Sequence, residues 1–342
     1  MRGLRYPAAV AAVPVKVEET SMRLIVGLVC GAFALLSAPA QSQDYPTKPI
    51  RILVPFAPGG IVDTAARVVG QKLHERWGQQ VIVDNRPGGN GFIAVTAAAK
   101  SPADGYTLLM AHTGEFAVNP AVFKDVPYDL ERDFTPITLI NDAPMVFVVH
   151  AGGPINSMQE LIAAAKAKPG TVGVSTPGTG TINHLVLEWA GLATGAKFLH
   201  VPYKGGAPAI TAVAGGEVPA GTAALGSAMP HIQSGRVRVV AVTTDERSPV
   251  NMSWPTLKES GVTNVRSSIW AGLFAPKGTP QPIIDKLYAE IAQILQLPDV
   301  KERFAAGGGV PGGMKPAEFA AKIKKEAADL KELVVAANVK PE

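Results

Sequence analysis

The chain has 342 residues, of which 47% are hydrophobic and 18% charged, and its formal net charge is +4. This length and apolar content favour a globular protein with two domains more than one. The small net charge, together with the lack of Lys/Arg-rich runs, aromatic ladders or zinc-finger spacing in the sequence, excludes nucleic acid as an expected partner.

The first forty residues read as a targeting segment. Met22-Arg23 precedes an apolar run at residues 24–36, and Ala38-Pro39-Ala40 has the small-x-small pattern of a cleavage site. The run is shorter than the roughly 20 residues that span a bilayer. We therefore expect residues 1–40 to be an N-terminal extension and signal peptide, with translation starting at Met22 and cleavage after Ala40. A retained N-terminal anchor is the alternative.

The single cysteine, Cys30, lies in this apolar run, and Val29 stands where a lipoprotein signal needs a small residue. The mature protein is therefore expected to have neither a lipid anchor nor a cysteine. Without cysteine, it can form no disulfide, thiolate metal site or cysteine nucleophile. The sequence predicts an exported protein.

From Asp44 onward, strand-like and helix-like segments alternate. The expected strands are apolar runs at residues 50–54, 81–83, 106–110, 137–140, 145–149, 172–175, 198–201, 237–242 and 269–275. Helical periodicity fills most gaps, with apolar stripes that start at Ile61, Ile182 and Phe319. This alternation predicts an α/β fold built around mainly parallel sheets.

Residues 141–144 separate two of these strand-like runs and leave no room for a helix. We expect the chain to cross there between domains as one extended segment, and to return near residues 246–262. The predicted domains are then residues 44–142 plus 252–342, and residues 143–251. The cleft between two such domains is a common place for a ligand.

Three predicted strand-to-helix turns share a Pro-Gly pair and small residues, at residues 55–63, 84–92 and 174–184. The N-terminus of a helix offers unpaired N–H groups and the positive end of the helix dipole. Such a turn can hold a carboxylate or phosphate without Lys or Arg. The first and third turns belong to different predicted domains, so together they would grip one small anion from both sides. The alternative is that these glycines and prolines only shape the turns.

Two side chains in these turns have open roles. Asp63 lies in the first turn of its helix, where a negative charge is favourable, so a structural role competes with ligand contact. His184, on the apolar side of a helix start, is expected to be a packed or capping histidine more than a base.

The motifs of common enzyme classes are incomplete. The Gly178-Thr179-Gly180 stretch lacks the third glycine of a dinucleotide fingerprint, because Asn183 stands in its place. Pro177 replaces the second glycine of a nucleophile elbow, and no Gly-Lys-Ser/Thr phosphate loop occurs. The 6 histidines show no spacing typical of a zinc site. We therefore expect no catalytic residue, no metal and no cofactor.

Six motifs follow one another along the chain: YPTKPIRILVPFAPGGIVDTAAR, VIVDNRPGGNGFIA, SPADGYTLLM, DFTPITLI, HVPYKGGAPAI and GLFAPKGTPQPIIDKL. Together they resemble the extracytoplasmic solute receptors of tripartite tricarboxylate transporters, also called Bug-type periplasmic binding proteins. The resemblance covers the chain from about Tyr45 to near the C-terminus.

The resemblance implies a type II periplasmic-binding fold, a Venus flytrap of two α/β domains joined by crossing strands, with a ligand cleft between them. It implies a periplasmic receptor that catalyses nothing. Such a receptor captures a small carboxylate in the periplasm for the permease subunits of the transporter in the membrane. We expect a monomer. The alternatives are a binding protein that feeds a two-component sensor kinase, and an exported α/β enzyme.

In this family, backbone amides, hydroxyls and ordered waters of two loops hold the carboxylate. On this chain the first loop gives Phe56, Ala57, Pro58, Gly59, Gly60 and Asp63. The second loop gives Ser175, Thr176, Gly178, Thr179, Gly180, Thr181 and His184. The candidate ligand-binding set is completed by Thr113, Gly114, Tyr203 and Ala224. The aromatic rings of Phe56 and Tyr203 are expected to face the pocket; the alternative is that they belong to the core.

Four residues depart from the pattern of the family. Ala223 and Ala224 stand where relatives often have a polar pair, so we hypothesise a ligand with a hydrophobic or aromatic body and not a citrate-like tricarboxylate. Pro177 stiffens its turn and removes one N–H. Glu115 stands where small or polar residues are common. Facing the pocket, it would disfavour a second carboxylate or favour an amine; the alternative is that it points to solvent.

Overall fold

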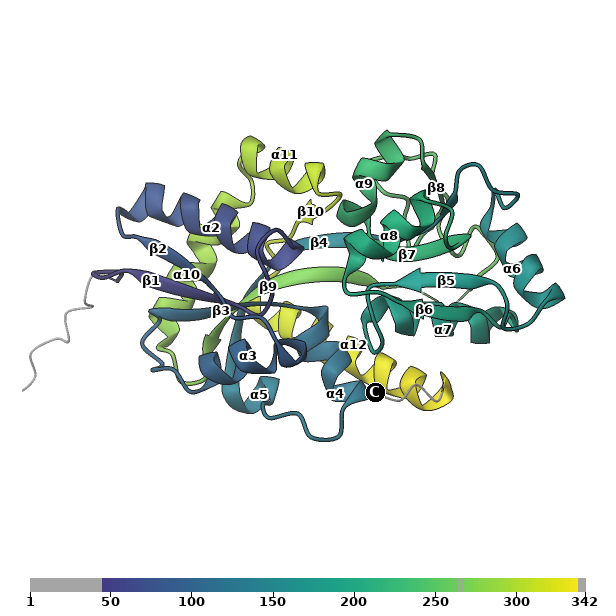
Figure 1. Cartoon of the computed structure of the whole chain (residues 1–342). Coiled ribbons are helices and arrows are strands. Elements are labelled where there is room, and N and C mark those ends of the chain that lie inside the picture. The colour runs from purple at the N-terminus through teal and green to yellow at the C-terminus, as the bar shows by residue number, and fades with distance from the viewer. Residues whose placement is uncertain (1–44, 264, 266, 338–342) are drawn as a thin grey trace, which may run out of the picture. The chain divides into compact units, whose positions relative to one another are not determined.

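The computed structural model describes residues 45–263, 265 and 267–337. The expected start site, signal peptide and cleavage site lie outside the described residues, as does Cys30. Residues from Lys48 onward form one compact unit, in which helices cover both faces of a sheet (Figure 1). Within the described ranges, none of the helices combines the length and the apolar character that a membrane crossing needs.

The strands are β1 (Ile50–Val54), β2 (Val81–Asn85), β3 (Thr107–His112), β4 (Phe134–His150), β5 (Gly173–Thr176), β6 (Leu199–Pro202), β7 (Ala220–Ala224), β8 (Val237–Val242), β9 (Ser268–Pro276) and β10 (Val310–Pro311). They follow the order β2-β1-β3-β9-β4-β7-β5-β6, and β8 and β10 also pair with β4. The pairs of β1 and of β5 are parallel, as expected. The expectation of a mainly parallel sheet is wrong, because β4 and β9 run antiparallel to every strand they pair with.

The helices are α2 (Ile61–Trp77), α3 (Phe92–Ala99), α4 (Asn119–Val122), α5 (Leu130–Asp133), α6 (Met158–Ala167), α7 (Ile182–Thr194), α8 (Gly206–Ala214), α9 (Leu225–Gln233), α10 (Gln281–Ile294), α11 (Pro298–Ala306) and α12 (Pro316–Ala337). Two short turns join them, the 3-10 helix η1 (Gly89–Gly91) and the π-helix η2 (Gly114–Val118). The predicted apolar stripes lie on α2, α7 and α12. Their buried members, such as Leu73, Leu185 and Phe319, face the core.

Strand β4 carries the chain from the β1–β3 side of the sheet to the β5–β8 side (Figure 1). Residues 141–144 lie inside it, so the prediction that this segment is continuous and extended is confirmed. Strand β9 runs back beside β4, with Ser268 opposite Pro144 and Pro276 opposite Phe134. Residues 246–262, expected to form the return passage, instead lie beside β8, where Val242 N donates to Pro255 O. The boundaries of the two domains stay a prediction.

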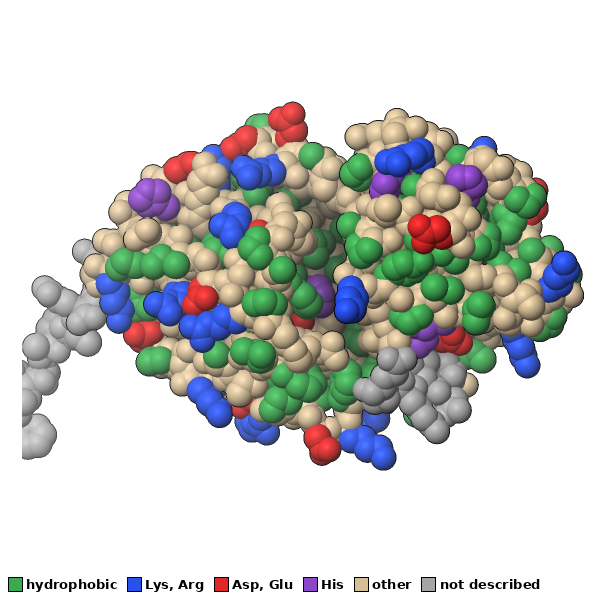
Figure 2. Space-filling view, viewed as in Figure 1, with side chains coloured by type: hydrophobic (Ala, Val, Ile, Leu, Met, Phe, Trp, Pro, Cys, Tyr) green, Lys and Arg blue, Asp and Glu red, His purple; other side chains and the backbone are tan. Residues whose placement is uncertain are grey.

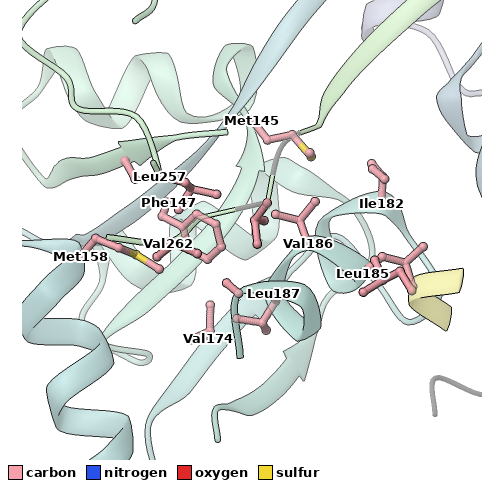
Figure 3. Packing of buried hydrophobic residues seen from close by; sticks show 14 of the residues in the cluster. Met145, Phe147, Met158, Val174, Ile182, Leu185, Val186, Leu187, Leu257 and Val262 are labelled. Atoms are coloured by element: carbon pink, nitrogen blue, oxygen red, sulfur yellow. The ribbon is translucent and has the colours of Figure 1, made fainter. Parts of the chain in front are cut away.

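A continuous apolar core packs β4 and β5 against α7, as Figure 3 shows. Phe147 on β4, Val174 on β5 and Val186 on α7 are fully buried, and Leu257 reaches the same cluster from the segment after β8. Burying each large side chain contributes about 1.5–3 kcal/mol. This packing fixes the start of α7, and with it one wall of the cavity described next.

Candidate functional site

A cavity of about 290 Å³ lies where the turns after β1, β3, β5, β6 and β7 converge. It is lined by Phe56, Ile61, Asn90, His112, Gly114, Glu115, Val118, Asn119, Pro177, Thr179, Gly180, Thr181, Ile182, Asn183, Gly205, Gly206, Ala224, Ser227 and Ile269. The lining residues from Phe56 to Asn119 belong to elements before β4 in the chain, and those from Pro177 to Ile269 to elements after it. Figure 2 shows the surface hollowed between these two groups of elements. A larger hollow of about 490 Å³ lies beside Gly191 and Leu192, where α7 ends and the negative end of its dipole lies.

Four helices of eight or more residues begin at this cavity. Ile61 is the first residue of α2, while Thr181, Gly205 and Ala224 are the N-caps of α7, α8 and α9. The N–H groups of a first helical turn have no partner inside the helix, and each N-terminus carries about half a positive charge. No Lys, Arg or Asp occurs among the lining residues. The attraction of this cavity for an anion therefore comes from N–H groups and helix dipoles.

Asp63 shapes the turn between β1 and α2 from inside. Its carboxylate accepts hydrogen bonds from Gly59 N (2.9 Å), Arg67 Nε (3.0 Å) and Asn85 Nδ2 (2.9 Å), and Asn85 Nδ2 also donates to Phe56 O. Burial raises the pKa of Asp63, but the hydrogen bonds from Arg67, Gly59 and Asn85 outweigh burial and hold the pKa below its usual value. The side chain is 3% exposed and does not line the cavity, so it positions Phe56 through the backbone.

The turn between β5 and α7 is capped by its own side chains. Thr181 Oγ1 donates to Gly178 O (2.8 Å) and accepts from His184 N (3.4 Å). His184 Nδ1 accepts from Gly180 N (3.1 Å), and its ring stacks on that of His200 at 3.8 Å. Burial first, and then the positive potential of His200, lowers the pKa of His184 to about 4. His184 is therefore a neutral, packed acceptor beside the cavity.

Ser175 and Thr176 are fully buried and use their hydroxyls inside the protein. Ser175 Oγ donates to Ala209 O (2.8 Å), and Thr176 Oγ1 lies 2.7 Å from His200 Nε2. Tyr203 joins them through its backbone, because its N–H donates to Thr176 O (3.0 Å). These residues hold the turn in place and do not line the cavity.

The turn after β3 brings a histidine and a glutamate to the cavity. Glu115 is 1% exposed, so the alternative that it points to solvent is wrong. Glu115 Oε2 accepts from His112 N (2.8 Å) and lies 2.9 Å from His112 Nδ1, to which Gly114 N also donates (2.8 Å). Thr113, between them, accepts from Trp270 N (3.1 Å) and so ties this turn to β9. The ring of His112 lies 4.5 Å from that of Phe56.

The cavity gathers part of the predicted set: Phe56, Gly114, Thr179, Gly180, Thr181 and Ala224. The other predicted residues lie outside its lining, namely Ala57, Pro58, Gly59, Gly60, Asp63, Thr113, Ser175, Thr176, Gly178, His184 and Tyr203. Their contact with a ligand stays a prediction.

Sequence reasoning missed Ile61, Asn90, His112, Val118, Asn119, Ile182, Asn183, Gly205, Gly206, Ser227 and Ile269. Two signals could have found some of them. Asn90 lies in the second Pro-Gly turn, and Gly205-Gly206 forms a fourth glycine turn before a helix. Across the described parts of the chain, no group of three or more His, Cys, Asp and Glu side chains is arranged to hold a metal ion.

Residues 65–339 match the family described as "Tripartite tricarboxylate transporter family receptor". The protein BugT of Bordetella pertussis is 38% identical over 293 residues, which are 85% of this chain and 90% of BugT. The structure of R. palustris Rpa4515 with adipate has a TM-score of 0.81 at 33% identity, covering 87% of this chain and 100% of Rpa4515. MatC of Rhodopseudomonas palustris, with bound malate, has a TM-score of 0.75 at 28% identity, covering 85% of this chain and 100% of MatC.

Proposed function

Because the chain belongs to the family of tripartite tricarboxylate transporter receptors, we propose that it captures a small carboxylate in the periplasm and delivers it to permease subunits in the membrane. The observation that carries this proposal is the convergence of four helix N-termini on a cavity without Lys or Arg. Such a cavity binds an anion and offers no nucleophile–base pair aimed at it, so the proposed role is binding without catalysis.

The lining also supports a ligand with an apolar body. Apolar side chains make up a large part of it, namely Phe56, Ile61, Val118, Ile182, Ala224 and Ile269. The volume of about 290 Å³ is at the small end of ligand pockets, which usually measure about 300–1,000 Å³. The relatives Rpa4515 and MatC hold adipate and malate, which are acids of this size class. We therefore propose a small acid with a hydrophobic or aromatic body.

A thermal-shift screen tests the proposal. The protein from Gln41 onward is unfolded and refolded to remove any bound ligand, and is then mixed with adipate, malate, benzoate or glutamate. An acid at about a hundredfold over its Kd adds about 2.7 kcal/mol to the stability, which raises Tm by several degrees. A flat response to every acid would contradict the proposal.

The variant Ala224→Asp separates binding from folding. Ala224 is the N-cap of α9 and makes no side-chain capping bond, so an aspartate there supplies a cap worth about 0.5–2 kcal/mol. The same carboxylate places a negative charge in the cavity lining, so the thermal shift should vanish while the fold stays stable. Pro280→Asp is the matched control, because Pro280 is an exposed, uncapped N-cap of α10 away from the cavity. It should keep the full shift.

A further inference from the structure

Within the part of the chain that the structure describes, His112 and Glu115 are the only titratable side chains that line the cavity. The Glu115 side chain is 1% exposed, whereas that of His112 is 21% exposed and faces the cavity beside Phe56. Among the described residues, no hydrogen bond to His112 Nε2 is found, although His112 Nδ1 has two close neighbours. The free nitrogen of this ring is therefore available to a ligand.

The 2.9 Å between His112 Nδ1 and Glu115 Oε2 fixes where one proton lies. Two lone pairs at this distance repel each other, so a proton must stand between the two atoms. Because His112 Nδ1 also accepts from Gly114 N, its lone pair is in use and this proton lies on Glu115 Oε2. The proton of the ring is then on Nε2, the pair is neutral, and Nε2–H is a donor. When one of the two protons is lost, the pair has a net charge of −1, the remaining proton on Nδ1 opposes Gly114 N–H, and Nε2 is an acceptor.

We propose that the ligand binds to the neutral, two-proton form of the His112–Glu115 pair, with His112 Nε2–H donating a hydrogen bond to a carboxylate of the ligand. This proposal rests on the proposed function, and it names the group that recognises the anion. The sequence led us to expect that Glu115, facing the pocket, would disfavour a carboxylate and favour an amine. The proposal reverses this expectation, because the neutral pair can bind a carboxylate and offers no negative charge to an ammonium group.

The surroundings of Glu115 favour the neutral form when an anion is present. Glu115 Oε1 is buried, and no hydrogen-bond partner for it is found among the described residues. It faces Gly91, where an added Cβ would lie only 2.6 Å away. A buried carboxylate charge without a partner is costly, and a second negative charge beside it raises that cost. Since the lining offers no Lys or Arg, a proton is the neutralising charge that this wall can take up.

Titratable groups on the elements packed against the pair already have partners. Asp63 on α2 is held by its own ion pair, and Glu326 on α12 accepts a hydrogen bond from Trp270 Nε1 (2.7 Å). Tyr128 OH donates to the backbone oxygen of Glu115 (2.9 Å) and carries no charge. None of these groups can replace the proton on the pair.

The proposal predicts a direction for the pH dependence. At high pH, where the pair has lost its second proton, the anion meets a negative charge and a lone pair. Binding coupled to the uptake of one proton weakens by up to about tenfold per pH unit.

Isothermal titration calorimetry of the protein from Gln41 onward tests this, with adipate first and then the other three acids of the screen. Measurements at pH 5.5, 6.5, 7.5 and 8.5, in two buffers of different ionisation heat, give both Kd and the number of protons taken up. We expect the tightest binding at pH 5.5 and uptake of about one proton at pH 8.5.

Glu115→Gln makes the test sharp. His112 N–H and His112 Nδ1 both face Glu115 Oε2, so the amide of glutamine can satisfy only one of them. With its NH2 group at that place, glutamine donates to Nδ1 and keeps the ring proton on Nε2, and it gives up the bond from His112 N–H. Glutamine carries no negative charge in either orientation, so the Kd of the variant should no longer rise with pH, and the variant should bind more tightly than the wild type at pH 8.5. A structural defect would weaken binding instead. His74→Gln, at an exposed position on α2 outside the cavity, is the control and should keep the wild-type pH slope.

The outcomes separate the two proposals. Binding of an acid with no pH slope, or with a slope of the opposite sign, overturns the His112 proposal and leaves the proposed function standing. Failure of all four acids at pH 5.5 overturns both. Should Glu115→Gln not fold, the 15N shifts of His112 in the wild type give the same answer, because ligand at pH 7.5 must add a proton at Nε2. Shifts that stay unchanged on saturation with ligand would contradict it.

Discussion

Replacing Asp63 with alanine measures how strongly one buried carboxylate holds the turn between β1 and α2. Asp63 is 3% exposed and receives hydrogen bonds from Gly59 N, Arg67 Nε and Asn85 Nδ2 at 2.9–3.0 Å. Removing the acceptor of a charged hydrogen bond costs about 1.5–3 kcal/mol when the donor stays buried. Gly59 is exposed and Arg67 half-exposed, so water can replace the carboxylate for these two donors. We expect the free energy of unfolding to fall by about 2 kcal/mol.

The pH dependence of this loss has a definite sign. The pKa of Asp63 in the folded protein is below its usual value, because the hydrogen bonds from Arg67, Gly59 and Asn85 outweigh burial. A group with a depressed pKa contributes its full stability above its unfolded pKa, about 3.9, and loses it as the pH falls through the folded value. The variant and the wild type should thus differ most near pH 7, and their stabilities should converge in strong acid.

Urea denaturation at pH 7 and at pH 3 measures both effects. The control is Asp329→Ala, since Asp329 also forms an i,i+4 ion pair, with Lys325, but both side chains are about half-exposed. An exposed pair of this kind contributes about 0.3–0.5 kcal/mol. If Asp63→Ala were no more costly than Asp329→Ala, the turn would not depend on this carboxylate, and the reasoning that links Asp63 to the position of Phe56 would be refuted.

Three further changes have expected outcomes. Gly91→Ala should lower the free energy of unfolding by about 1–3 kcal/mol, and by more than Gly78→Ala. Both glycines have positive φ, but only at Gly91 would the added Cβ lie 2.6 Å from a side-chain atom, Glu115 Oε1. Thermal melts of the two variants settle the order. His184 has a pKa of about 4, below the unfolded value of about 6.5, so its burial should cost stability as the pH falls between these values, by up to about 3 kcal/mol. In His184→Gln, urea denaturation should show a smaller loss between pH 7 and pH 4.5 than in the wild type. Thr181→Ala and Ser157→Ala each remove an N-cap and should each cost about 1 kcal/mol, but only the first should weaken ligand binding in calorimetry, because Ser157 caps α6 outside the cavity.

The regular elements could be predicted where local pattern and burial agree. The runs at 50–54 and 237–242 correspond to β1 and β8, because an apolar strand buried on both faces has no competing helical period. Strand β7 escaped prediction because its sequence, AGTAA, has little β-branched content and owes its strand conformation to pairing with β4 and β5. The antiparallel course of β9 likewise depends on partners distant in sequence.

The candidate site was predictable to the extent that its backbone is. The glycine turns before α2 and α7 are local signals, so Phe56 and the residues 179–181 could be found in the sequence. The direction of each side chain is not local. Ser175 and Thr176 are polar and lie next to the cavity, yet tertiary contacts turn both hydroxyls inward. His112 carried no signal at all, since only the fold brings its ring to the same cavity as α7.

The helix N-termini alone do not account for tight binding. The other lining residues must supply the rest of the binding free energy. A charge at a helix N-terminus gains about 0.3–1 kcal/mol, so four of them together supply about 1–4 kcal/mol. Even the upper value corresponds to a Kd of only about 1 mM. A micromolar Kd needs roughly 4 kcal/mol more. Apolar contact with Phe56 and Ile269 can supply part of it, at about 25 cal/mol per Å² buried. A hydrogen bond from His112 to a charged carboxylate contributes about 1.5–3 kcal/mol, a factor of about 10–100 in Kd. Because helix dipoles and apolar contacts do not titrate, any strong pH dependence of binding must come from the His112–Glu115 pair or from the ligand itself, and Glu115→Gln separates these two sources.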